Sequence, residues 1–574
     1  MDKHSWRRFF LNRIKGNSGT GEMATLSFAP KDRKSRIPAK AFPVFTFCLL
    51  SVPALSPSAY CQKAEQQPNI ILILADDMGY SDIGCYGSEI QTPNLDKLAQ
   101  QGIRFTQFYN ASVCCPTRSS LLTGLYQHQA GVGCMVNDLG YPSYQGYLNT
   151  QCVTLAEALK YNGYNTYISG KWHVGSKPET LPAKRGFDRY FRLIPGARSY
   201  FQRIPDRNNQ SATRIMFDNS DFNPPDSLYY LTDAITDYAL SFLKQRSAKK
   251  DPFFLYLAYT APHWPLHALP EDIAKYCGKY MKGWDKLRQE RYERMLKLGV
   301  IDSSTKLSPR DDNSPEWDSL SNEEKRMWDQ KMAVYAAMID RMDQGIGQVI
   351  EQLTLMGDLE NTLILFLSDN GGCSQDIKGL SKSFLTTGEI GSPDSFEAYG
   401  TPWANVSNTP FRMFKTWVHE GGIATPFIAW FPERIKGGKI IRQPGHIIDL
   451  MPTLLEFAGG KYPENYNGNK IPPMEGISLL PALKGMSLKR ENPLFWEFKG
   501  NRAMRSADWK LVSVYDNSSK RFKTWELYDL RSDRSELIDL SSKYPELVNQ
   551  MIEQYNKWAD RVGVVSKEAI DNKK

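Results

Sequence analysis

The amino-acid sequence predicts an α/β fold in which helices flank a large, mostly parallel (mixed) sheet, followed by a small C-terminal α+β domain on a short antiparallel sheet. From residue 68 onward, short apolar runs alternate with amphipathic stretches, and after about residue 485 short strand-like runs follow one another closely. The 574 residues are 41% hydrophobic and 23% charged, which is a globular composition. A chain of this length is long enough for roughly two to four domains.

The first strand and helix set the pattern for the main domain. Asn69-Ile-Ile-Leu-Ile-Leu74 is a continuous apolar run, as expected of a strand that is buried on both faces. Residues 93–102 read as a helix with Pro93 at its start and Gly102 just past its end. Strands alternating with helices indicate a parallel sheet. The remaining strand predictions are residues 165–169, 253–258, 362–367 and 426–430, and the remaining helix predictions are residues 154–161, 232–246 and 334–355.

The C-terminal part predicts a different architecture. Short strands are expected close together, and an amphipathic helix follows them at residues 546–562. We therefore predict a main domain at residues 66–485 and a C-terminal α+β subdomain at residues 486–574. Residues 374–410, rich in Ser, Gly, Thr and Pro, predict a long loop, and loops of that length are usually functional. The C-terminal strands are expected at residues 493–498, 502–505, 509–514 and 525–530.

The N-terminal 61 residues have the composition of a targeting segment. The net charge is +8, and residues 1–40 account for +7 of it, which argues against a nucleic-acid partner for the rest of the chain. Basic residues 31–40 precede an apolar run at 41–52 and small residues at 54–61, as in a secretory signal. We expect an exported protein, periplasmic or secreted, made by way of the export machinery. Cys61 is a weak candidate for lipid attachment, and Met23 is an alternative start.

No apolar stretch approaches the roughly 20 residues of a membrane-spanning helix, so no transmembrane span is expected in the mature chain. Seven cysteines lie outside the targeting segment. An odd number in an exported chain leaves at least one outside any disulfide.

Polar residues follow four of the predicted strands. Asp76-Asp77 comes after the first and Asp369-Asn370 after the strand at 362–367, while Lys171, His173 and His263 follow the two strands between them. Ligands of parallel sheets bind beyond the carboxyl ends of the strands, so these side chains are expected at one rim. Three carboxylates and an amide, with no thiolate, suit a hard cation such as Ca²⁺ or Mg²⁺. For a single Asp at a strand end, a turn or helix-cap role would be favoured, but two polar doublets at equivalent strand ends favour a site.

The most specific motif is Cys114-Cys-Pro-Thr-Arg-Ser-Ser-Leu-Leu-Thr-Gly124. Cys114 lies just before Pro116 at the expected start of a short helix, with Arg118 about one turn on. A helix N-terminus and a guanidinium both stabilise an anion at that position. A structural disulfide, for example with Cys134 or Cys152, is the alternative, but it does not account for the whole string.

This string resembles the signature of type I, formylglycine-dependent sulfatases of the alkaline phosphatase superfamily, Cys-x-Pro-x-Arg…Thr-Gly, and the chain is close to bacterial arylsulfatases. The resemblance extends from about Pro68 to Val564, with Thr117 in place of the Ser or Ala of many members. It implies conversion of Cys114 to formylglycine. It also implies one Ca²⁺ per chain, held by the modified Cys114 together with Asp76, Asp77, Asp369 and Asn370.

The resemblance further implies roles for the cationic residues. Arg118 would neutralise the formylglycine, Lys171 and Lys415 would grip the sulfate oxygens, and His173 would contact the formylglycine. His263 would protonate the leaving oxygen as a general acid. One hydroxyl of the hydrated aldehyde would be the nucleophile, and the cations and the metal would surround the charge that develops on the sulfate.

The implied function is hydrolysis of sulfate esters, of an arylsulfatase type and acting on sulfated carbohydrates, with release of inorganic sulfate. Its partners would be a sulfated small-molecule or glycan substrate and a formylglycine-generating maturation enzyme. A phosphonate or phosphate ester hydrolase of the same superfamily is one alternative, and a catalytically dead glycan-binding homologue is another. Loops at residues 195–227 and 373–408 would frame the substrate. Their aromatic residues, which serve as sugar platforms or as loop anchors, are Tyr200, Phe201, Tyr399 and Trp403.

Overall fold

The computed structural model describes residues 66–193, 196, 198–201, 215–224, 229–246, 251–377 and 388–573. The predicted targeting segment, residues 1–61, lies outside the described residues. None of the described helices has both the length and the apolar character that crossing a membrane requires.

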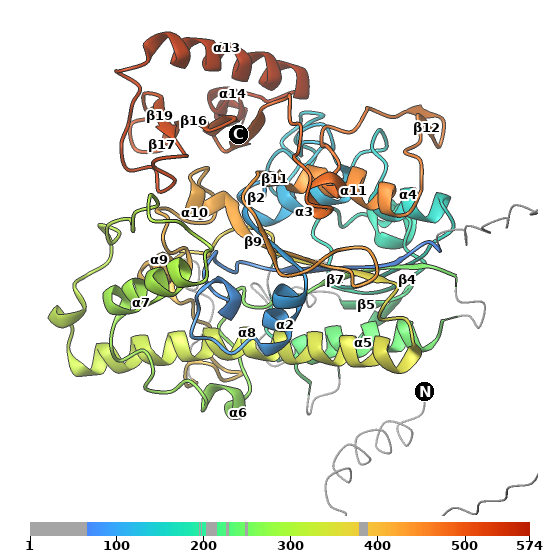
Figure 1. Ribbon diagram of the computed structural model, residues 1–574, viewed down its shortest axis with the longest axis horizontal. Coiled ribbons are helices and arrows are strands. Elements are labelled where there is room, and N and C mark those ends of the chain that lie inside the picture. The colour runs from blue at the N-terminus through green and yellow to red at the C-terminus, as the bar shows by residue number, and fades with distance from the viewer. Residues whose placement is uncertain are drawn as a thin grey trace, which may run out of the picture. The chain divides into compact units, whose positions relative to one another are not determined.

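A large mixed sheet forms the centre of the fold (Figure 1), in the order β10-β2-β9-β8-β1-β7-β3-β4-β5-β6, with β11 beside β2. Its four central neighbours β8, β1, β7 and β3 are parallel, whereas β9 runs antiparallel to β8 and β2. This confirms the predicted fold class. The strands are β1 Asn69–Ala75, β2 Ile103–Tyr109, β3 Asn165–Lys171, β4 Arg189–Leu193, β5 Ile215–Phe217, β6 Ser220–Phe222, β7 Phe253–Ala258, β8 Thr362–Ser368, β9 Ala424–Trp430, β10 Lys439–Ile441 and β11 Gly445–His446.

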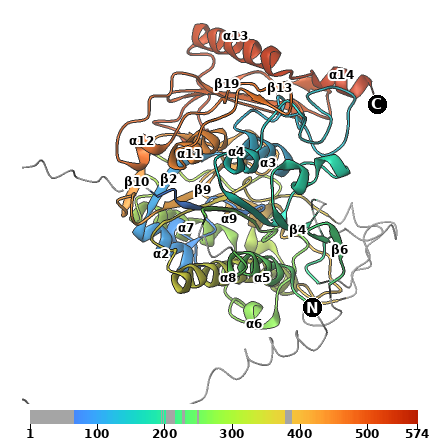
Figure 2. The same ribbon diagram turned by 90° about the vertical axis from the view of Figure 1, so that its right-hand side faces the viewer.

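Helices cover both faces of this sheet, as Figures 1 and 2 show. Alternate residues of β1 point to opposite faces. Ile71 and Ile73 pack in the hydrophobic cluster that includes α2, α5 and α8, whereas Ile70, Leu72 and Leu74 pack with α3, α4 and α11. The helices of these two layers are α2 Pro93–Gln101, α3 Cys114–Thr123, α4 Leu155–Tyr161, α5 Leu231–Lys244, α8 Asn322–Met356 and α11 Leu450–Phe457.

Helix α8 is longer than the predicted helix at residues 334–355. It begins at Asn322, because Ser321 and Glu324 form a reciprocal capping box there. The predicted loop at residues 374–410 is also corrected, since α9 occupies Gly400–Ser407. Residues 378–387 of that loop lie outside the described part. The other helices of the main part are α6 Pro270–Ile273, α7 Trp284–Lys297, α10 Glu420–Ile423 and α12 Leu480–Leu483.

The C-terminal residues form the predicted antiparallel sheet, in the order β14-β15-β16-β19. The proposed division into residues 66–485 and 486–574 stays a prediction. The C-terminal elements are β14 Leu494–Phe498, β15 Asn501–Ser506, β16 Trp509–Ser513, β19 Glu526–Asp529, α13 Pro545–Val562 and α14 Lys567–Asn572, with the short hairpin β17 Tyr515–Asp516 and β18 Arg521–Phe522. Another short hairpin, β12 Asn465–Tyr466 with β13 Asn469–Lys470, precedes them.

A buried charge cluster joins this small sheet to the large one. We name it the clamp cluster; its members are Glu420, Lys510, Arg534 and Glu536. Lys510 Nζ lies 2.9 Å from Glu420 Oε1 and 2.8 Å from Glu536 Oε1, and the Glu420 backbone N–H donates to Glu536 Oε2. Because Tyr109 of β2 also donates to Glu420, at 2.9 Å, the cluster connects β2, α10 and β16.

Candidate active site

The register of the central strands brings the predicted site residues together. Ala75 of β1 pairs with Ser368 of β8, so Asp76 and Asp369 each follow one residue beyond a paired position. The backbone N–H of Asp369 donates to Ala75 O at 3.1 Å. On the other side of β1, Ala258 of β7 pairs with Leu74 and Gly170, and Lys171 is the last residue of β3. The four predicted strand ends therefore lie side by side.

The acidic and amide residues at these ends are buried and in contact. The Asp77 backbone N–H donates to Asp369 Oδ1 at 3.2 Å, and Asn370 Nδ2 donates to Asp77 Oδ1 at 2.6 Å. Asp76, Asp77, Asp369 and Asn370 are each at most 2% exposed. Two of their oxygens, Asp76 Oδ1 and Asn370 Oδ1, are buried without a hydrogen-bond partner. Buried oxygens of this kind normally have a partner, so this donor set fits a hard divalent cation.

Three cationic side chains neutralise the carboxylates. Lys171 Nζ lies 2.5 Å from Asp76 Oδ2, and Lys415 Nζ lies 2.7 Å from Asp77 Oδ1. Arg118 donates from Nη2 to Asp369 Oδ2 at 2.8 Å and lies 3.5 Å from Asp76. We name these six charged residues the catalytic cluster.

The carboxylates of the catalytic cluster have shifted pKa values. Burial, followed by the charge of Asp76, raises the pKa of Asp369 to about 7, against the opposing effect of Arg118 and Lys171. Burial also favours the neutral amine of Lys415, but the charges of Asp77, Cys114, Cys373 and Asp76 together outweigh it and hold the pKa of Lys415 well above its ordinary value. A cation bound in this cluster would be attracted by the carboxylates and partly repelled by the lysines.

Cys114 is the first residue of α3 and is a free thiol, 2% exposed. The disulfide alternative therefore does not apply to this thiol. A hydrogen bond from Cys115 lowers the pKa of Cys114 well below its ordinary value; burial opposes this, and the charges of Lys171, His173 and Lys415 support it. His173 is 4% exposed, and its Nδ1 has no hydrogen-bond partner. Cys114, Cys115 and His173 each offer a ligand atom within 4.8 Å of the others.

His263 approaches from the turn that follows β7. Its Nδ1 donates to Trp264 O at 2.6 Å, since a carbonyl can only accept, and this directs Nε2 toward Asp77 Oδ2 at 3.4 Å. The Tyr200 hydroxyl holds the turn by donating to Thr260 O and His263 O. Burial lowers the pKa of His263 to about 3. The turn thus fixes the ring orientation and presents Nε2 to the catalytic cluster.

Several residues at the site have a left-handed backbone. The φ angles of Asp77, Ser112, His173, Met413 and Thr416 lie between 55° and 77°. Non-glycine residues rarely adopt this conformation, and it gathers at functional sites because the surrounding structure must enforce it.

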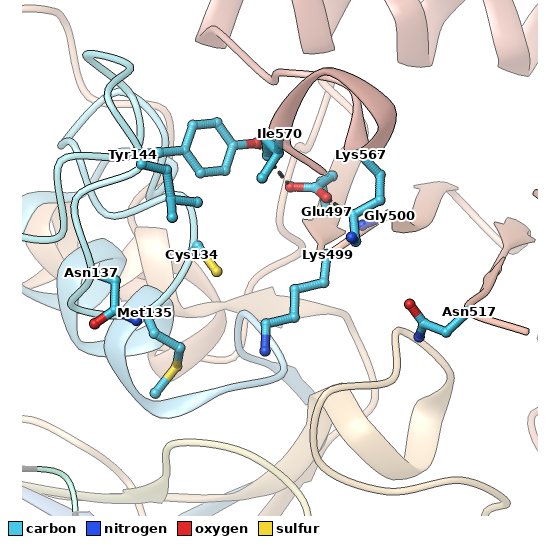
Figure 3. Close-up of a pocket in the computed structure, with 11 residues that line it drawn as sticks. Cys134, Met135, Asn137, Tyr144, Glu497, Lys499, Gly500, Asn517, Lys567 and Ile570 are labelled. Atoms are coloured by element: carbon cyan, nitrogen blue, oxygen red, sulfur yellow. Dashed lines mark hydrogen bonds between the residues drawn. The ribbon is translucent and has the colours of Figure 1, made fainter. Parts of the chain in front are cut away.

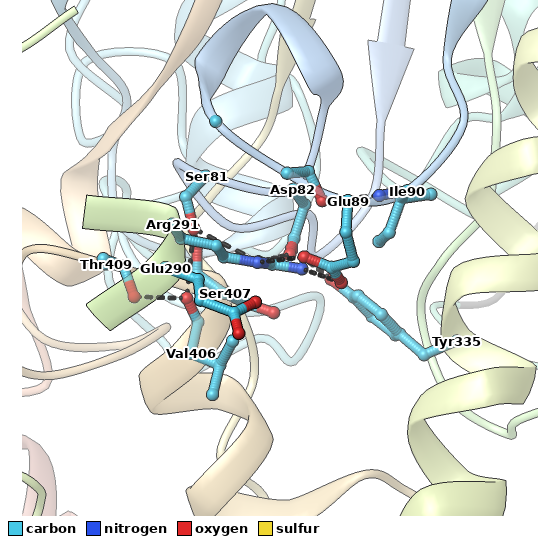
Figure 4. A network of polar contacts seen from close by, with 12 residues as sticks. Ser81, Asp82, Glu89, Ile90, Glu290, Arg291, Tyr335, Val406, Ser407 and Thr409 are labelled. Atoms are coloured by element: carbon cyan, nitrogen blue, oxygen red, sulfur yellow. Dashed lines mark hydrogen bonds and ion pairs between the residues drawn. The ribbon is translucent and has the colours of Figure 1, made fainter. Parts of the chain in front are cut away.

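The buried polar network around Asp82, Arg291 and Tyr335 in Figure 4 holds the Asp77 backbone through the Tyr335 hydroxyl. The Tyr335 hydroxyl of α8 lies 2.7 Å from Asp82 Oδ2 and 3.2 Å from Asp77 O, and Arg291 of α7 donates to Asp82 Oδ1 at 2.7 Å. Arg291 also forms a bidentate pair with Glu89, with both distances 2.9 Å. Sequence analysis missed these residues, because none of them ends a strand or belongs to the Cys114 motif.

The aromatic residues predicted near the substrate act as anchors where they are buried. Trp403 is fully buried and donates from Nε1 to Trp328 O at 2.9 Å. Tyr200 is 1% exposed and Tyr399 is 3% exposed, with the Tyr399 ring stacked on Tyr335 at 4.3 Å. These three rings are therefore not available as sugar platforms. Phe201 is partly buried and contacts Tyr230.

Comparisons with known proteins agree with this geometry. The family model described as "Sulfatase" matches residues 68–460, and that described as "N-sulphoglucosamine sulphohydrolase, C-terminal" matches residues 411–561. An uncharacterized sulfatase of Schizosaccharomyces pombe is 36% identical over 536 residues, which is 88% of this chain and 96% of that protein. An arylsulfatase of Klebsiella aerogenes is 37% identical over 428 residues, covering 72% of this chain and 92% of that protein.

Solved structures show the same likeness. The crystal structure of Ps i-CgsB in complex with k-i-k-neocarrahexaose matches with a TM-score of 0.63 and 29% identity, covering 86% of this chain and 93% of that one. The predicted resemblance to the sulfatases of the alkaline phosphatase superfamily is thereby confirmed. The chain belongs to the sulfatase family and is a sulfuric ester hydrolase.

Proposed function

We propose that this protein is an exported sulfatase of sulfated carbohydrates that uses formylglycine at position 114 and one Ca²⁺. The observation that carries the proposal is the catalytic cluster: three carboxylates and Lys171 at the ends of β1, β8 and β3, joined by Arg118 of α3 and by Lys415, with the charges of the two lysines acting on the buried Cys114. A sulfate ester needs such an environment, because its charge spreads over several oxygens as the sulfur–oxygen bond breaks.

The metal would be held by Asp76, Asp77, Asp369 and Asn370. The two unpartnered oxygens of this set support the assignment, and the all-oxygen donors favour Ca²⁺ or Mg²⁺ over softer metals. When bound, the cation would act as a Lewis acid toward the sulfate oxygens. The formylglycine would supply the nucleophilic hydroxyl of its hydrate.

The remaining chemistry belongs to residues present in the chain. Lys171 and Lys415 would bind the sulfate oxygens, since both ammonium groups are buried at the rim and would lose part of their pairing with Asp76 and Asp77 to the cation. Arg118 would neutralise the negative charge of Asp369 and of the modified residue 114. His263, held by Trp264 O, would present Nε2 to the leaving oxygen. Because its pKa in the free enzyme is about 3, Nε2 must take up its proton together with the anionic substrate, whose charge favours the imidazolium.

A carbohydrate substrate is proposed because a similar structure, Ps i-CgsB, was solved with k-i-k-neocarrahexaose. A maturation enzyme is a proposed partner because residue 114 would have to be converted to formylglycine. The export machinery is a proposed partner because of the predicted signal at residues 1–61. Cys61 as a lipid attachment site stays a prediction.

The decisive experiment is peptide mass spectrometry of residue 114 in active enzyme. We expect the mass loss of thiol-to-aldehyde oxidation at Cys114, while the adjacent Cys115 remains an alkylatable thiol and serves as the internal control. An unmodified Cys114 in protein with full activity toward an aryl sulfate would contradict the proposal. The Cys114→Ala variant should lose activity by on the order of 10⁴-fold or more, as expected when a covalent nucleophile is removed.

A further inference from the structure

A cavity of about 370 Å³ lies between the loop at residues 132–146 and the C-terminal sheet (Figure 3). One wall carries Met135 and Asn137, and the other carries Lys499, Asn517 and Lys567. In Figure 3, Lys499 extends from its turn toward the space between Met135 and Asn137 on one side and Asn517 on the other.

Both walls are connected to the catalytic site by short links. Asn501, at the start of β15, donates from Nδ2 to the backbone carbonyl of Thr416, which follows Lys415. On the other side, Leu148 follows the loop and donates its backbone N–H to Val174 O, next to His173. No residue of the catalytic cluster lines the cavity. These links place the two walls within a few residues of Lys415 and His173, while the groups that would hold the reacting sulfate lie outside the cavity.

Lys499 occupies an unfavourable backbone position. Lys499 and Gly500 form the two-residue turn between β14 and β15, with φ angles of 51° and 90°. Two positive φ angles in such a turn favour Asn-Gly or Gly-Gly, and a lysine in the first position is strained. Lysine is thus a poor choice for the turn itself. Its presence points to a use for the side chain.

The charge of Lys499 has no acidic partner among the described residues; its Nζ lies 5.3 Å from the centroid of the Phe498 ring, which leaves the ammonium open to an anion. The side chain is exposed and forms no ion pair with any described residue. Glu497, the nearest acid in the cavity wall, is already bound by His128 Nε2 at 2.9 Å, by the Tyr144 hydroxyl at 3.3 Å and by the Gly500 backbone N–H at 2.8 Å. Lys567, by contrast, pairs with Asp571. Lys499 is therefore the cation in this wall that has charge to offer to a ligand.

We propose that this cavity is a subsite for an acidic group, sulfate or carboxylate, on a sugar adjoining the one whose sulfate ester is hydrolysed. Lys499 supplies the charge, and the side-chain amides of Asn137 and Asn517 supply hydrogen bonds. The inference rests on the proposed function, because it places the reacting sulfate at the catalytic cluster. It narrows the substrate to an oligosaccharide with more than one acidic group.

The test measures binding, so that it does not depend on turnover. Calorimetry on full-length Cys114→Ala protein would compare three tetrasaccharides: one from κ-carrageenan with sulfates only, one from hyaluronan with carboxylates only, and a neutral one from agarose. The key variant adds Lys499→Asn, which suits the left-handed turn and should not lower the Tm. Lys484→Asn, at an exposed lysine outside the cavity, is the matched control.

We expect Lys499→Asn to raise the Kd of at least one acidic tetrasaccharide by about 3–10-fold and to leave the neutral one within about twofold. A rise in Kd for the κ-carrageenan ligand alone would indicate a sulfate subsite, and a rise for the hyaluronan ligand alone would indicate a carboxylate subsite. Added salt should reduce the difference. Equal weakening of all three ligands, no change for either acid, or no binding of either acid to the parent protein would overturn the subsite. If the unmutated enzyme did not hydrolyse aryl sulfates, that result would instead contradict the proposed function.

Discussion

The catalytic cluster and the clamp cluster are both buried, and both combine carboxylates with lysine and arginine, yet they differ in how their oxygens are used. In the clamp cluster, both Glu420 oxygens have partners, Lys510 at Oε1 and Tyr109 at Oε2. In the clamp cluster, even Glu536 Oε1, which accepts no hydrogen bond, is paired with Lys510 Nζ at 2.8 Å, whereas in the catalytic cluster Asp76 Oδ1 has no hydrogen-bond partner.

This difference separates two uses of buried charge. A carboxylate with every oxygen partnered holds two elements together, and breaking the pair costs stability. A carboxylate that keeps an unpartnered oxygen beside a strand end can still bind a cation. The following experiments should separate loss of activity in one cluster from loss of stability in the other.

Among the experiments that compare the two clusters, the largest expected effect is on activity, from His263→Ala. A sugar alkoxide needs a proton as it leaves, so this variant should lose about 10²–10⁴-fold in kcat on a sulfated sugar and much less on a nitrophenyl sulfate. Lys415→Ala is the contrast, since it would weaken both substrates similarly through the sulfate that they share. Equal losses on both substrates in His263→Ala would show that His263 only binds or positions.

A comparable effect on stability is expected from Lys510→Met in the clamp cluster. Glu420 and Glu536 would be left buried without their lysine, which should lower the free energy of unfolding by about 3–5 kcal/mol in urea titrations. Lys171→Met is the matched variant, since Lys171 is also a fully buried lysine in an ion pair. With Ca²⁺ present, Lys171→Met should cost activity more than stability. The reverse ranking would mean that the two clusters do not differ as described.

Calcium removal should produce the next largest effect. A ligand at about 100 times its Kd stabilises the folded state by about 2.7 kcal/mol, so chelation should lower the Tm and calcium should restore it. The shift should be much smaller in Asp369→Asn, which weakens the donor set. If chelation changes the Tm of Asp369→Asn and of the unmutated protein equally, the metal lies elsewhere.

The smallest effect is expected from Tyr335→Phe. This change removes the hydroxyl that joins Asp82 to the Asp77 carbonyl, so Asp77 should be held less firmly and the calcium Kd should rise by about 10-fold. Tyr555→Phe removes a buried hydroxyl that has no hydrogen-bond partner and serves as the control. An unchanged calcium Kd in Tyr335→Phe, measured by calorimetry, would show that the network is structural only.

The sequence predicts the central sheet well because its signal is local. β1, β7 and β8 are continuous apolar runs, and each is recognisable without its neighbours. Strands β5 and β6 have three residues each and depend on pairing with one another, so they were not predicted. The first turns of α8 are polar and were missed for the same reason: their helical signal is the Ser321 capping box and not an apolar face.

The site residues also divide into those with a signal in the sequence and those without one. Asp76, Lys171 and Asp369 were predictable from position, because topology places the ends of parallel strands at one rim. Lys415 follows no strand and was expected from the family resemblance alone. The contact of Arg291 with Asp82 joins residues 209 positions apart and leaves no local pattern from which it could be predicted.

The burial of Cys114 has a consequence for the order of events during synthesis. A thiol that is 2% exposed at the start of a helix cannot reach the active site of another enzyme, so an enzyme that oxidises it must act before this region folds. Folding of the site requires Lys415, which is synthesised roughly 300 residues after Cys114. At about 5–20 residues per second, that interval lasts on the order of 15–60 s. If residue 114 is converted to formylglycine as proposed, maturation and folding would compete in time, and a slower maturation enzyme would leave a larger fraction of correctly folded but inactive protein.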